Sequence, residues 1–297
     1  MIRCERATVE RGGLVVCESV ALVVSPGHAT ALVGSSGAGK SSLLAAAATA
    51  LPLHAGDILV DGRSVRREAD AVRRLVGYVP ARMPPWPGVR VDEFLELFAD
   101  AAGLRGAAID AALERALALA GFERRGHLQV DDLAAGEAKR LLLARALMHE
   151  PPVLLLDDPF SGLDPAGRRD AERLVADAHL VGRTVLAALD DADVPGCFTH
   201  VAAMREGRIV AEGPADPAAF TDRTWTHRIA CPGRAPEAVR AIGPLVDEAA
   251  AVADDAVTCR HDPARGPFSE VIAALVKAGI PVEAAGFDPP WAAQLFG

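Results

Sequence analysis

Hydrophobic residues near the N-terminus follow the pattern of β-strands. The runs 2–9 and 14–24 are rich in β-branched residues, and the run 29–33 is continuously apolar. A short apolar run bounded by glycines is typical of a buried parallel strand. The next residues, 40–50, are helix formers, so we expect a strand, a glycine-rich turn and a helix in succession.

The pattern then alternates between strands and helices. We predict strands at 57–60, 75–79, 153–156, 184–189, 201–204 and 208–210, and helices at 91–102, 107–120, 135–148 and 166–181. The proline-rich stretch 80–88 is predicted to be a loop. Strands that alternate with helices predict an α/β fold, in which helices cover a parallel sheet.

A change in patterning marks a second region of the chain. Pro214, Asp216 and Pro217 cluster at the boundary, so we predict one domain over 1–212, a linker over 213–223 and an accessory domain over 224–297. Within the last region the apolar runs 226–231, 256–259 and 280–284 are predicted strands, and 268–278 is a predicted amphipathic helix. This region is therefore predicted to be a small α+β domain.

Composition narrows the possible classes of protein. The chain has 297 residues, 51% of them hydrophobic, and a formal net charge of −9. Its longest apolar run, 43–53, is too short for a membrane-spanning helix, which needs about 20 residues. We expect neither a membrane span nor a secretory leader, and the acidic balance argues against broad contact with nucleic-acid backbones. The five cysteines lack a C-x-x-C spacing and are predicted to be free thiols of a reducing cytosol.

One motif points directly to phosphate chemistry. Residues 34–41 fit the pattern G-x-x-x-x-G-K-[ST], between a predicted strand and a predicted helix. Backbone N–H groups of such a loop converge on phosphate oxygens, assisted by the positive end of the helix. The predicted phosphate-binding residues are Gly34, Ser35, Ser36, Gly37, Ala38, Gly39, Lys40, Ser41 and Ser42. Lys40 would reach the β- and γ-phosphates, and Ser41 would bind Mg²⁺.

A second candidate lies at the end of the predicted strand 153–156. Asp157 and Asp158 follow this strand directly, and ligands of open α/β sheets bind where strands end. Asp157 is predicted to complete the Mg²⁺ shell. A single carboxylate at a strand end would more often be a helix cap, but the phosphate-binding motif upstream favours the metal interpretation.

These motifs belong to an ordered set that resembles the ATP-binding subunit of an ABC transporter, most closely that of ABC-2-type exporters. The phosphate-binding loop is followed by the segment 77–80, by a signature-like segment, by Asp157 and Asp158, and by a D-loop. The signature-like residues are Leu133, Ala134, Ala135, Gly136 and Glu137, and the D-loop residues are Ser161, Gly162, Leu163 and Asp164. The resemblance covers about residues 1–212, whereas the likeness of the tail to the accessory domain of such exporters is weak.

The resemblance implies a P-loop NTPase fold of the ABC type. It would comprise a RecA-like parallel sheet, an antiparallel β subdomain and a helical subdomain at about residues 85–150. The implied ligands are ATP and Mg²⁺. The implied partners are a second ATP-binding subunit and integral membrane subunits, which would hold the chain on the cytoplasmic face of the cell membrane, and no nucleic acid is expected.

Several positions differ from the family pattern. The Q-loop glutamine is replaced by Ala81, which can neither bind Mg²⁺ nor sense a partner, and the catalytic glutamate is replaced by the shorter Asp158. The switch histidine falls on Asp190, or on Leu189 if the gap is placed differently. Near the adenine, the family's aromatic residue would fall on Arg11 or Leu14.

The signature is altered as well. In the family, its serine hydroxyl and a glycine N–H contact the γ-phosphate bound by the opposite subunit; here the serine is Ala134. Loss of one electrostatic or general-base group typically slows an enzyme by about 10²–10⁴-fold. We therefore expect ATP·Mg²⁺ to bind, hydrolysis at this chain's own site to be slow or absent, and a heterodimer with a partner that carries intact residues.

The sequence leaves alternatives open. A non-hydrolysing ATP-binding module, in which nucleotide is a structural or regulatory ligand, is the second hypothesis. A soluble ATPase acting on nucleic acid is disfavoured by the net charge. Trp86 is either an anchor at an interface or a core residue. The acidic cluster of Asp190, Asp191 and Asp193 either binds a cation or is a solvated loop or helix cap, and the scattered histidines do not predict zinc.

Overall fold

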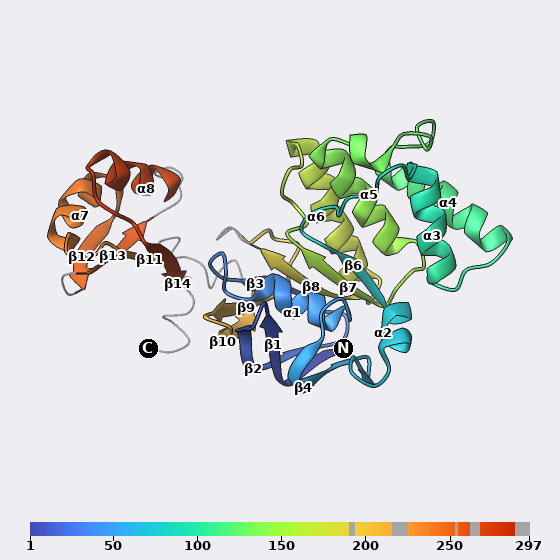
Figure 1. Cartoon of the computed structure of the whole chain (residues 1–297), viewed down its shortest axis with the longest axis horizontal. Helices are drawn as coiled ribbons and strands as arrows, with labels where there is room; N and C mark the ends of the chain where they lie inside the picture. The colour runs from blue at the N-terminus through green and yellow to red at the C-terminus, as the bar shows by residue number, and fades with distance from the viewer. Residues whose placement is uncertain (190–193, 216–224, 253–254, 262–267, 289–297) are drawn as a thin grey trace.

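The computed structural model describes residues 1–189, 194–215, 225–252, 255–261 and 268–288. Figure 1 shows the chain from end to end, with strands of the first domain stacked in two layers beneath a group of helices. Asp190, Asp191 and Asp193, three acidic residues singled out above, lie outside the described residues.

An antiparallel sheet contains the first strands of the chain. Its order is β2 (Leu14–Val24), β1 (Ile2–Arg11), β4 (Leu53–Val60) and β5 (Arg63–Ser64). The predicted strands at 2–9 and 14–24 are confirmed, and the strand predicted at 57–60 begins earlier, at Leu53. This sheet is the antiparallel β subdomain that the family resemblance implies.

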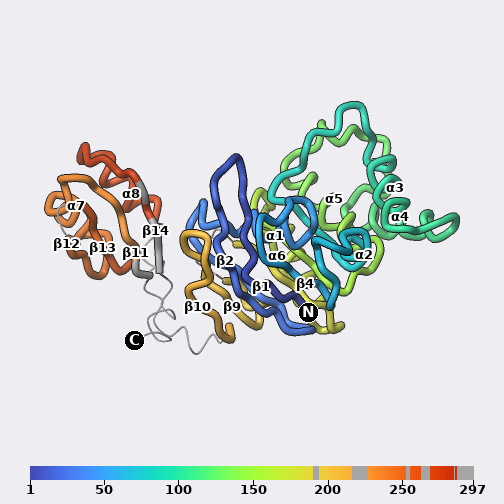
Figure 2. Tube along the Cα trace, turned by 60° about the horizontal axis from the view of Figure 1, so that its bottom comes forward, coloured from blue at the N-terminus to red at the C-terminus, as the bar shows by residue number. Residues whose placement is uncertain are grey.

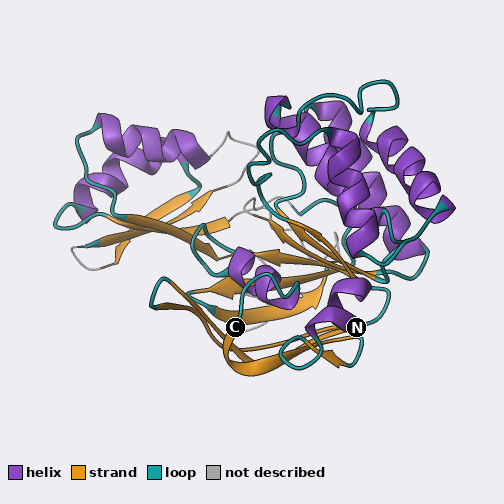
Figure 3. Cartoon of the chain, turned by 45° about the vertical axis from the view of Figure 1, so that its right-hand side comes forward, coloured by secondary structure: helices purple, strands orange, loops and turns teal. Residues whose placement is uncertain are grey.

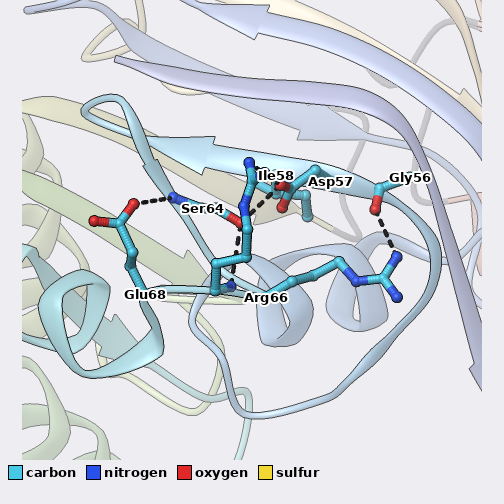
Figure 4. A network of polar contacts seen from close by, with 7 residues as sticks. Gly56, Asp57, Ile58, Ser64, Arg66 and Glu68 are labelled. Atoms are coloured by element: carbon cyan, nitrogen blue, oxygen red, sulfur yellow. Dashed lines mark hydrogen bonds and ion pairs between the residues drawn. The ribbon is translucent and has the colours of Figure 1, made fainter.

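A polar network fixes the turn that leaves this sheet (Figure 4). The Ser64 hydroxyl donates to Asp57 at 2.7 Å, and the Ser64 N–H donates to Glu68 at 3.3 Å. Arg66 donates to the carbonyl of Gly56 at 3.0 Å. These contacts hold the start of α2 (Ala69–Leu75), a short helix that the sequence analysis missed and that leads straight into the parallel sheet.

The parallel sheet forms the centre of the first domain. Its order is β10 (Arg208–Pro214), β9 (His200–Arg205), β3 (Ala29–Val33), β8 (Thr184–Leu189), β7 (Val153–Asp157) and β6 (Val76–Val79). Only β10 runs antiparallel to its neighbour within this sheet. Because the other strands are parallel, the loops after β3, β6, β7 and β8 leave the same edge.

Helices cover both faces of the parallel sheet. The helix α1 (Lys40–Ala47) lies between the two sheets, where its leucines join a core built from strands of both (Figure 1). The other face packs against α6 (Pro165–Leu180) and the helical subdomain, which is seen as the cluster of helices in Figure 3. That subdomain contains α3 (Val91–Ala101), α4 (Ala107–Ala120), the short η1 (Val130–Asp132) and α5 (Ala135–Leu147). The predicted α/β architecture is confirmed.

The C-terminal region forms a separate small α+β unit, coloured orange to red in Figure 2. Its elements are β11 (Trp225–Ala230), α7 (Ala235–Ile242), η2 (Gly243–Leu245), β12 (Glu248–Val252), β13 (Ala256–His261), α8 (Phe268–Lys277) and β14 (Ala284–Asp288). The strands are antiparallel in the order β12-β13-β11-β14. The sequence β-α-β-β-α-β in this order is the ferredoxin-like topology. Its core contains Ile229, Val257 and Leu275.

The sequence analysis was least accurate in this unit. It missed α7 and β12, and it placed a strand at 280–284, whereas only Ala284 of that range is in a strand. Ile280 is instead buried in the loop after α8, and the N–H of Glu283 donates to Ala230 before β14 begins. The alanine-rich sequence of β12 resembles a helix as much as a strand, since alanine is the strongest helix former.

Two further expectations concern the cysteines and the possibility of a membrane-spanning helix. All five cysteines lie in the described part of the chain and are free thiols, four of them buried. Burial raises the pKa of Cys4 and of Cys17 to about 12, which makes them core residues rather than nucleophiles. None of the helices in the described ranges combines the length and apolar character that a membrane crossing requires.

Candidate functional site

The glycine-rich loop connects β3 to α1 at the edge where the parallel strands end. Close packing fixes its course: a Cβ on Gly34 would lie 2.2 Å from the Met204 carbonyl oxygen. Gly39 adopts φ +103°, and a Cβ there would lie 2.4 Å from the carbonyl oxygen of Val16. Glycine is required at both positions because the backbone of neighbouring strands leaves no room for a side chain.

Lys40 is the first residue of α1 and is folded back onto this loop. Its Nζ donates to the carbonyls of Gly34 at 2.7 Å and Ser35 at 2.9 Å, and the side chain is only 4% exposed. No side chain in the described ranges caps α1, and its first turn contains no acidic residue. The N–H groups and the partial positive charge of this helix end therefore face the loop without a protein carboxylate on the helix itself.

Ser41 and Asp157 meet across the sheet edge. The Ser41 hydroxyl donates to Oδ1 of Asp157 at 2.9 Å, although 116 positions separate the two residues in sequence. Burial raises the pKa of Asp157, while the Ser41 hydroxyl, the Lys139 ammonium and the Ala81 N–H act against that rise. A hydroxyl beside a carboxylate is an all-oxygen donor set, which fits Mg²⁺.

Asp158 occupies an unusual backbone conformation directly after β7. Its φ is +49°, in the left-handed region that few residues other than glycine adopt. Its N–H donates to the carbonyl of Ala188 at 2.9 Å, and its side chain is half-buried. The carboxylate has the charge of a general base but a shorter reach than glutamate.

A buried lysine of the signature helix α5 connects two of these strand ends. Lys139 Nζ donates to the carbonyls of Ala81 and Asp158, both at 2.8 Å. Burial lowers the pKa of Lys139, and the nearby carboxylates of Asp158 and Asp157 act in the opposite direction. The sequence analysis assigned no role to this residue. The sequence does show that Lys139 is a charged residue on an apolar helical face, which it shares with Leu142, Leu143 and Ala146.

The signature-like segment lies at the N-terminus of α5. The N–H of Ala134 donates to the Glu137 carboxylate at 3.1 Å, and Arg125 donates to the same carboxylate at 2.7 Å. These contacts lower the pKa of Glu137, that of Arg125 most strongly. Because alanine has no hydroxyl, the N-cap residue Ala134 supplies no side-chain bond.

The D-loop lies against this signature-like segment. A Cβ on Gly136 would lie 3.0 Å from the carbonyl oxygen of Gly162, so the two loops touch. Asp164 caps α6 by accepting from the N–H of Gly167 at 2.7 Å, and Ser161 Oγ lies 3.5 Å from the carbonyl of Asp158. The structure thus brings the signature, the D-loop and the end of β7 together.

Two more sets of predicted positions are those of the switch residue and of the residue near the adenine. Asp190, the first candidate for the switch position, lies outside the described residues; Leu189, the alternative, is a buried apolar residue at the end of β8. Arg11 and Leu14 are both exposed at the β1–β2 turn, where Leu14 is 72% exposed. Neither presents an aromatic ring.

Trp86 is a partly buried core residue. Its ring packs edge-on against Phe94, with centroids 5.1 Å apart, and against Phe98 at 5.8 Å. Its backbone N–H donates to Asp131 at 2.7 Å. Of the two interpretations that the sequence left open for Trp86, the core interpretation agrees with the structure.

Comparison with known proteins places this geometry in context. The family model described as "ABC transporter" matches residues 17–161. The Nod factor export ATP-binding protein I of Cupriavidus metallidurans is 32% identical over 205 residues, which are 68% of this chain and 67% of that protein. The Fe(3+) ions import ATP-binding protein FbpC 2 of Rhodococcus jostii is 35% identical over 206 residues, 68% of this chain and 59% of that protein. The relatives thus include both an exporter and an importer component.

Solved structures agree with the sequence comparison. A structure described as an ATP-binding subunit of an ABC transporter superposes with a TM-score of 0.67 and 25% identity. The match covers 73% of this chain and 90% of that one.

Proposed function

Because the chain belongs to the family of ABC transporter ATP-binding proteins, we propose that it binds ATP·Mg²⁺ at the edge formed by the glycine-rich loop and Asp157. We propose further that hydrolysis at this site is slow or absent. The chain would then act mainly by binding nucleotide, and its degenerate site would leave the chemistry to a partner subunit.

The contact between Ser41 and Asp157 is the observation that carries this proposal. Their oxygens lie 2.9 Å apart, and Ser41 follows the buried Lys40 in the first turn of α1, which no side chain in the described ranges caps. In the proposal, Ser41 and Asp157 hold Mg²⁺, while Lys40 and the N–H groups of the loop hold the phosphates. ATP supplies the phosphoanhydride, and the protein supplies positioning and positive charge.

The proposed loss of hydrolysis rests on three side chains. The side chain of Ala81 has no amide oxygen to offer a metal ion, and Ala134 has no hydroxyl for the phosphate of an opposite subunit. Asp158 keeps a carboxylate, but it is one methylene shorter than glutamate, and a general base must lie within about 2.6–3.2 Å of its proton donor. Since these groups would act as a unit, their losses do not simply add.

The proposed assembly is a heterodimer with membrane partners. Two copies of this chain would form two impaired sites, so a second ATP-binding subunit of different sequence would contribute the catalytic residues. The pair would act on integral membrane subunits from the cytoplasmic face, and the resemblance to ABC-2-type exporters favours export. One relative named for export and one named for import match at similar identity, so direction rests on that resemblance alone.

Single-turnover hydrolysis by the purified complex tests this proposal. We expect the wild-type site to hydrolyse ATP slowly, Asp158→Asn to abolish that residual rate, and Asp158→Glu to increase it. If all three proteins bind ATP but are equally inactive, nucleotide is a structural or regulatory ligand instead. Failure to bind ATP·Mg²⁺ in calorimetry would overturn the proposal.

A further inference from the structure

The helix α5 buries a lysine in an otherwise apolar face. Lys139 is 4% exposed, and it lies one turn before Leu142 and Leu143 and two turns before Ala146, all of them buried. Lysine is almost never fully buried unless its ammonium is paired, because desolvation of the charge is unfavourable. The position of Lys139 therefore requires specific partners.

Those partners are two backbone carbonyls at the ends of adjacent strands. Residue 81 follows β6 and residue 158 follows β7, and the two strands pair in parallel, with Val79 opposite Leu156. Lys139 Nζ donates to the carbonyls of Ala81 and Asp158 at 2.8 Å each. A side chain of the helical subdomain therefore joins two strand ends of the parallel sheet.

Both strand ends lie next to the proposed metal site. The backbone N–H of Ala81 acts to lower the pKa of the Asp157 carboxyl, against the rise that burial causes, and the carbonyl of Ala81 accepts a hydrogen bond from Lys139 at 2.8 Å. Asp158 is held in its left-handed conformation from both sides, by its N–H on Ala188 and by its carbonyl on Lys139. Removal of the ammonium would leave the carbonyls of Ala81 and Asp158 without this donor and would leave Asp158 held by its N–H alone.

We propose that Lys139 is a positioning residue that holds Asp157 and Asp158 in place and links them to the signature helix. This proposal rests on the proposed function. The methyl side chain of Ala81 cannot bind Mg²⁺ or form a hydrogen bond, so it cannot link the proposed metal site to other segments. The ammonium of Lys139 provides such a link by binding the backbone carbonyl of Ala81. Because Lys139 lies on α5, the link extends to the signature-like segment at the N-terminus of that helix.

The test separates positioning from general stability by comparing two titrations. Calorimetry on the full-length chain measures the affinity for ADP in EDTA, which depends on the loop and Lys40, and for a non-hydrolysable ATP analogue with Mg²⁺, which also depends on Asp157. Lys139→Met removes the donors at similar length. We expect it to reduce the affinity for the Mg²⁺ analogue about tenfold, the effect of losing a charged hydrogen bond, and to leave ADP within about twofold.

Two further variants make the result decisive. Lys139→Gln keeps an N–H donor and should recover part of the Mg²⁺-dependent affinity. Arg140→Met changes the next residue of α5, whose guanidinium donates instead to the Ala120 carbonyl at 3.3 Å, and should change neither affinity. If Lys139→Met does not fold, the same ratio measured with Lys139→Gln against wild type gives the answer.

The outcomes distinguish the two proposals. Equal weakening of both ligands by Lys139→Met would make Lys139 a purely structural residue, and unchanged affinities would remove its role altogether; either result overturns the inference while the proposed function stands. If the wild-type chain binds neither ligand, the proposed function fails and the role of Lys139 fails with it.

Discussion

Two helices of the first domain begin in opposite ways. The helix α1 starts at Lys40 after a glycine in the left-handed conformation, and its first turn contains no carboxylate. The helix α5 starts at Ala135, and Glu137 in its first turn accepts a hydrogen bond from the N–H of Ala134. Each helix end carries the same partial positive charge, but only α5 satisfies it with a carboxylate of its own.

This difference suggests which helix end is suited to an external anion. At α1 the donors face a loop whose shape is fixed by close packing around Gly34 and Gly39, and a buried lysine adds a full positive charge. At α5 the Glu137 carboxylate and its partner Arg125 already form a closed local network. A phosphate that approached α5 would meet a negative charge, whereas one that approached α1 would meet none on the helix.

The strongest test of this contrast removes the charge at α1. Lys40→Ala deletes a buried ammonium that would contact phosphate, so we expect ATP·Mg²⁺ affinity to fall by about 10²-fold, as for a lost charge-assisted bond. Calorimetry measures the change. Lys277→Ala, an exposed lysine on α8, is the matched control and should bind like wild type. Retention of affinity within about twofold in Lys40→Ala would show that α1 is not the anion site.

A smaller effect is expected when the missing cap is restored at α5. Ala134 already has the extended conformation of an N-cap, with φ −61° and ψ 153°, so Ala134→Ser can add a hydroxyl without moving the backbone. One hydroxyl that donates to the γ-phosphate of an opposing nucleotide should strengthen ATP-dependent association with the partner about tenfold. Analytical ultracentrifugation of the complex with ATP checks this.

The control for this variant is Ala111→Ser, at an exposed position within α4 that has no cap geometry. It should leave association unchanged. If Ala134→Ser changes association no more than Ala111→Ser does, the signature-like segment of this chain does not take part in binding the opposite nucleotide.

Much of the first domain could be predicted because its chemistry is local in sequence. The glycine-rich motif between a strand and a helix predicts the loop, and a continuous apolar run predicts the strand that ends at Asp157. The contact between Ser41 and Asp157 could not be obtained from periodicity, because it depends on how α1 crosses between the two sheets. The two motifs, each assigned to the same Mg²⁺, indicated that these residues meet.

What the sequence did not predict depends on contacts between distant segments. Lys139 was visible as a charged residue on an apolar helical face, but its acceptors are backbone carbonyls, which have no sequence signature. In the C-terminal unit, β12 is a strand because it pairs with β13 along five residues, although its alanines favour a helix. Tertiary pairing outweighs local propensity there.

The smallest expected effect is a pH dependence at α5 that α1 lacks. Arg125 and the Ala134 N–H hold the pKa of Glu137 below its ordinary value, so the native state favours the ionised form. The resulting stabilisation is fully present above the ordinary pKa of glutamate, about 4.3, and is lost as the pH falls through the lowered value. Because both side chains of the pair are partly exposed, it should amount to no more than about 0.5 kcal/mol.

Thermal unfolding of wild type and Glu137→Gln between pH 7 and pH 3 measures this term. At neutral pH the variant should unfold about 1–2 °C lower than wild type, and the difference should shrink as the pH approaches 3. Glu96→Gln, at an exposed position on α3, gives the background for loss of a surface carboxylate. A difference in unfolding temperature that stays constant with pH would mean that the ionised carboxylate of Glu137 does not stabilise the N-terminus of α5. The contrast between α5 and α1 would then rest on Lys40 alone.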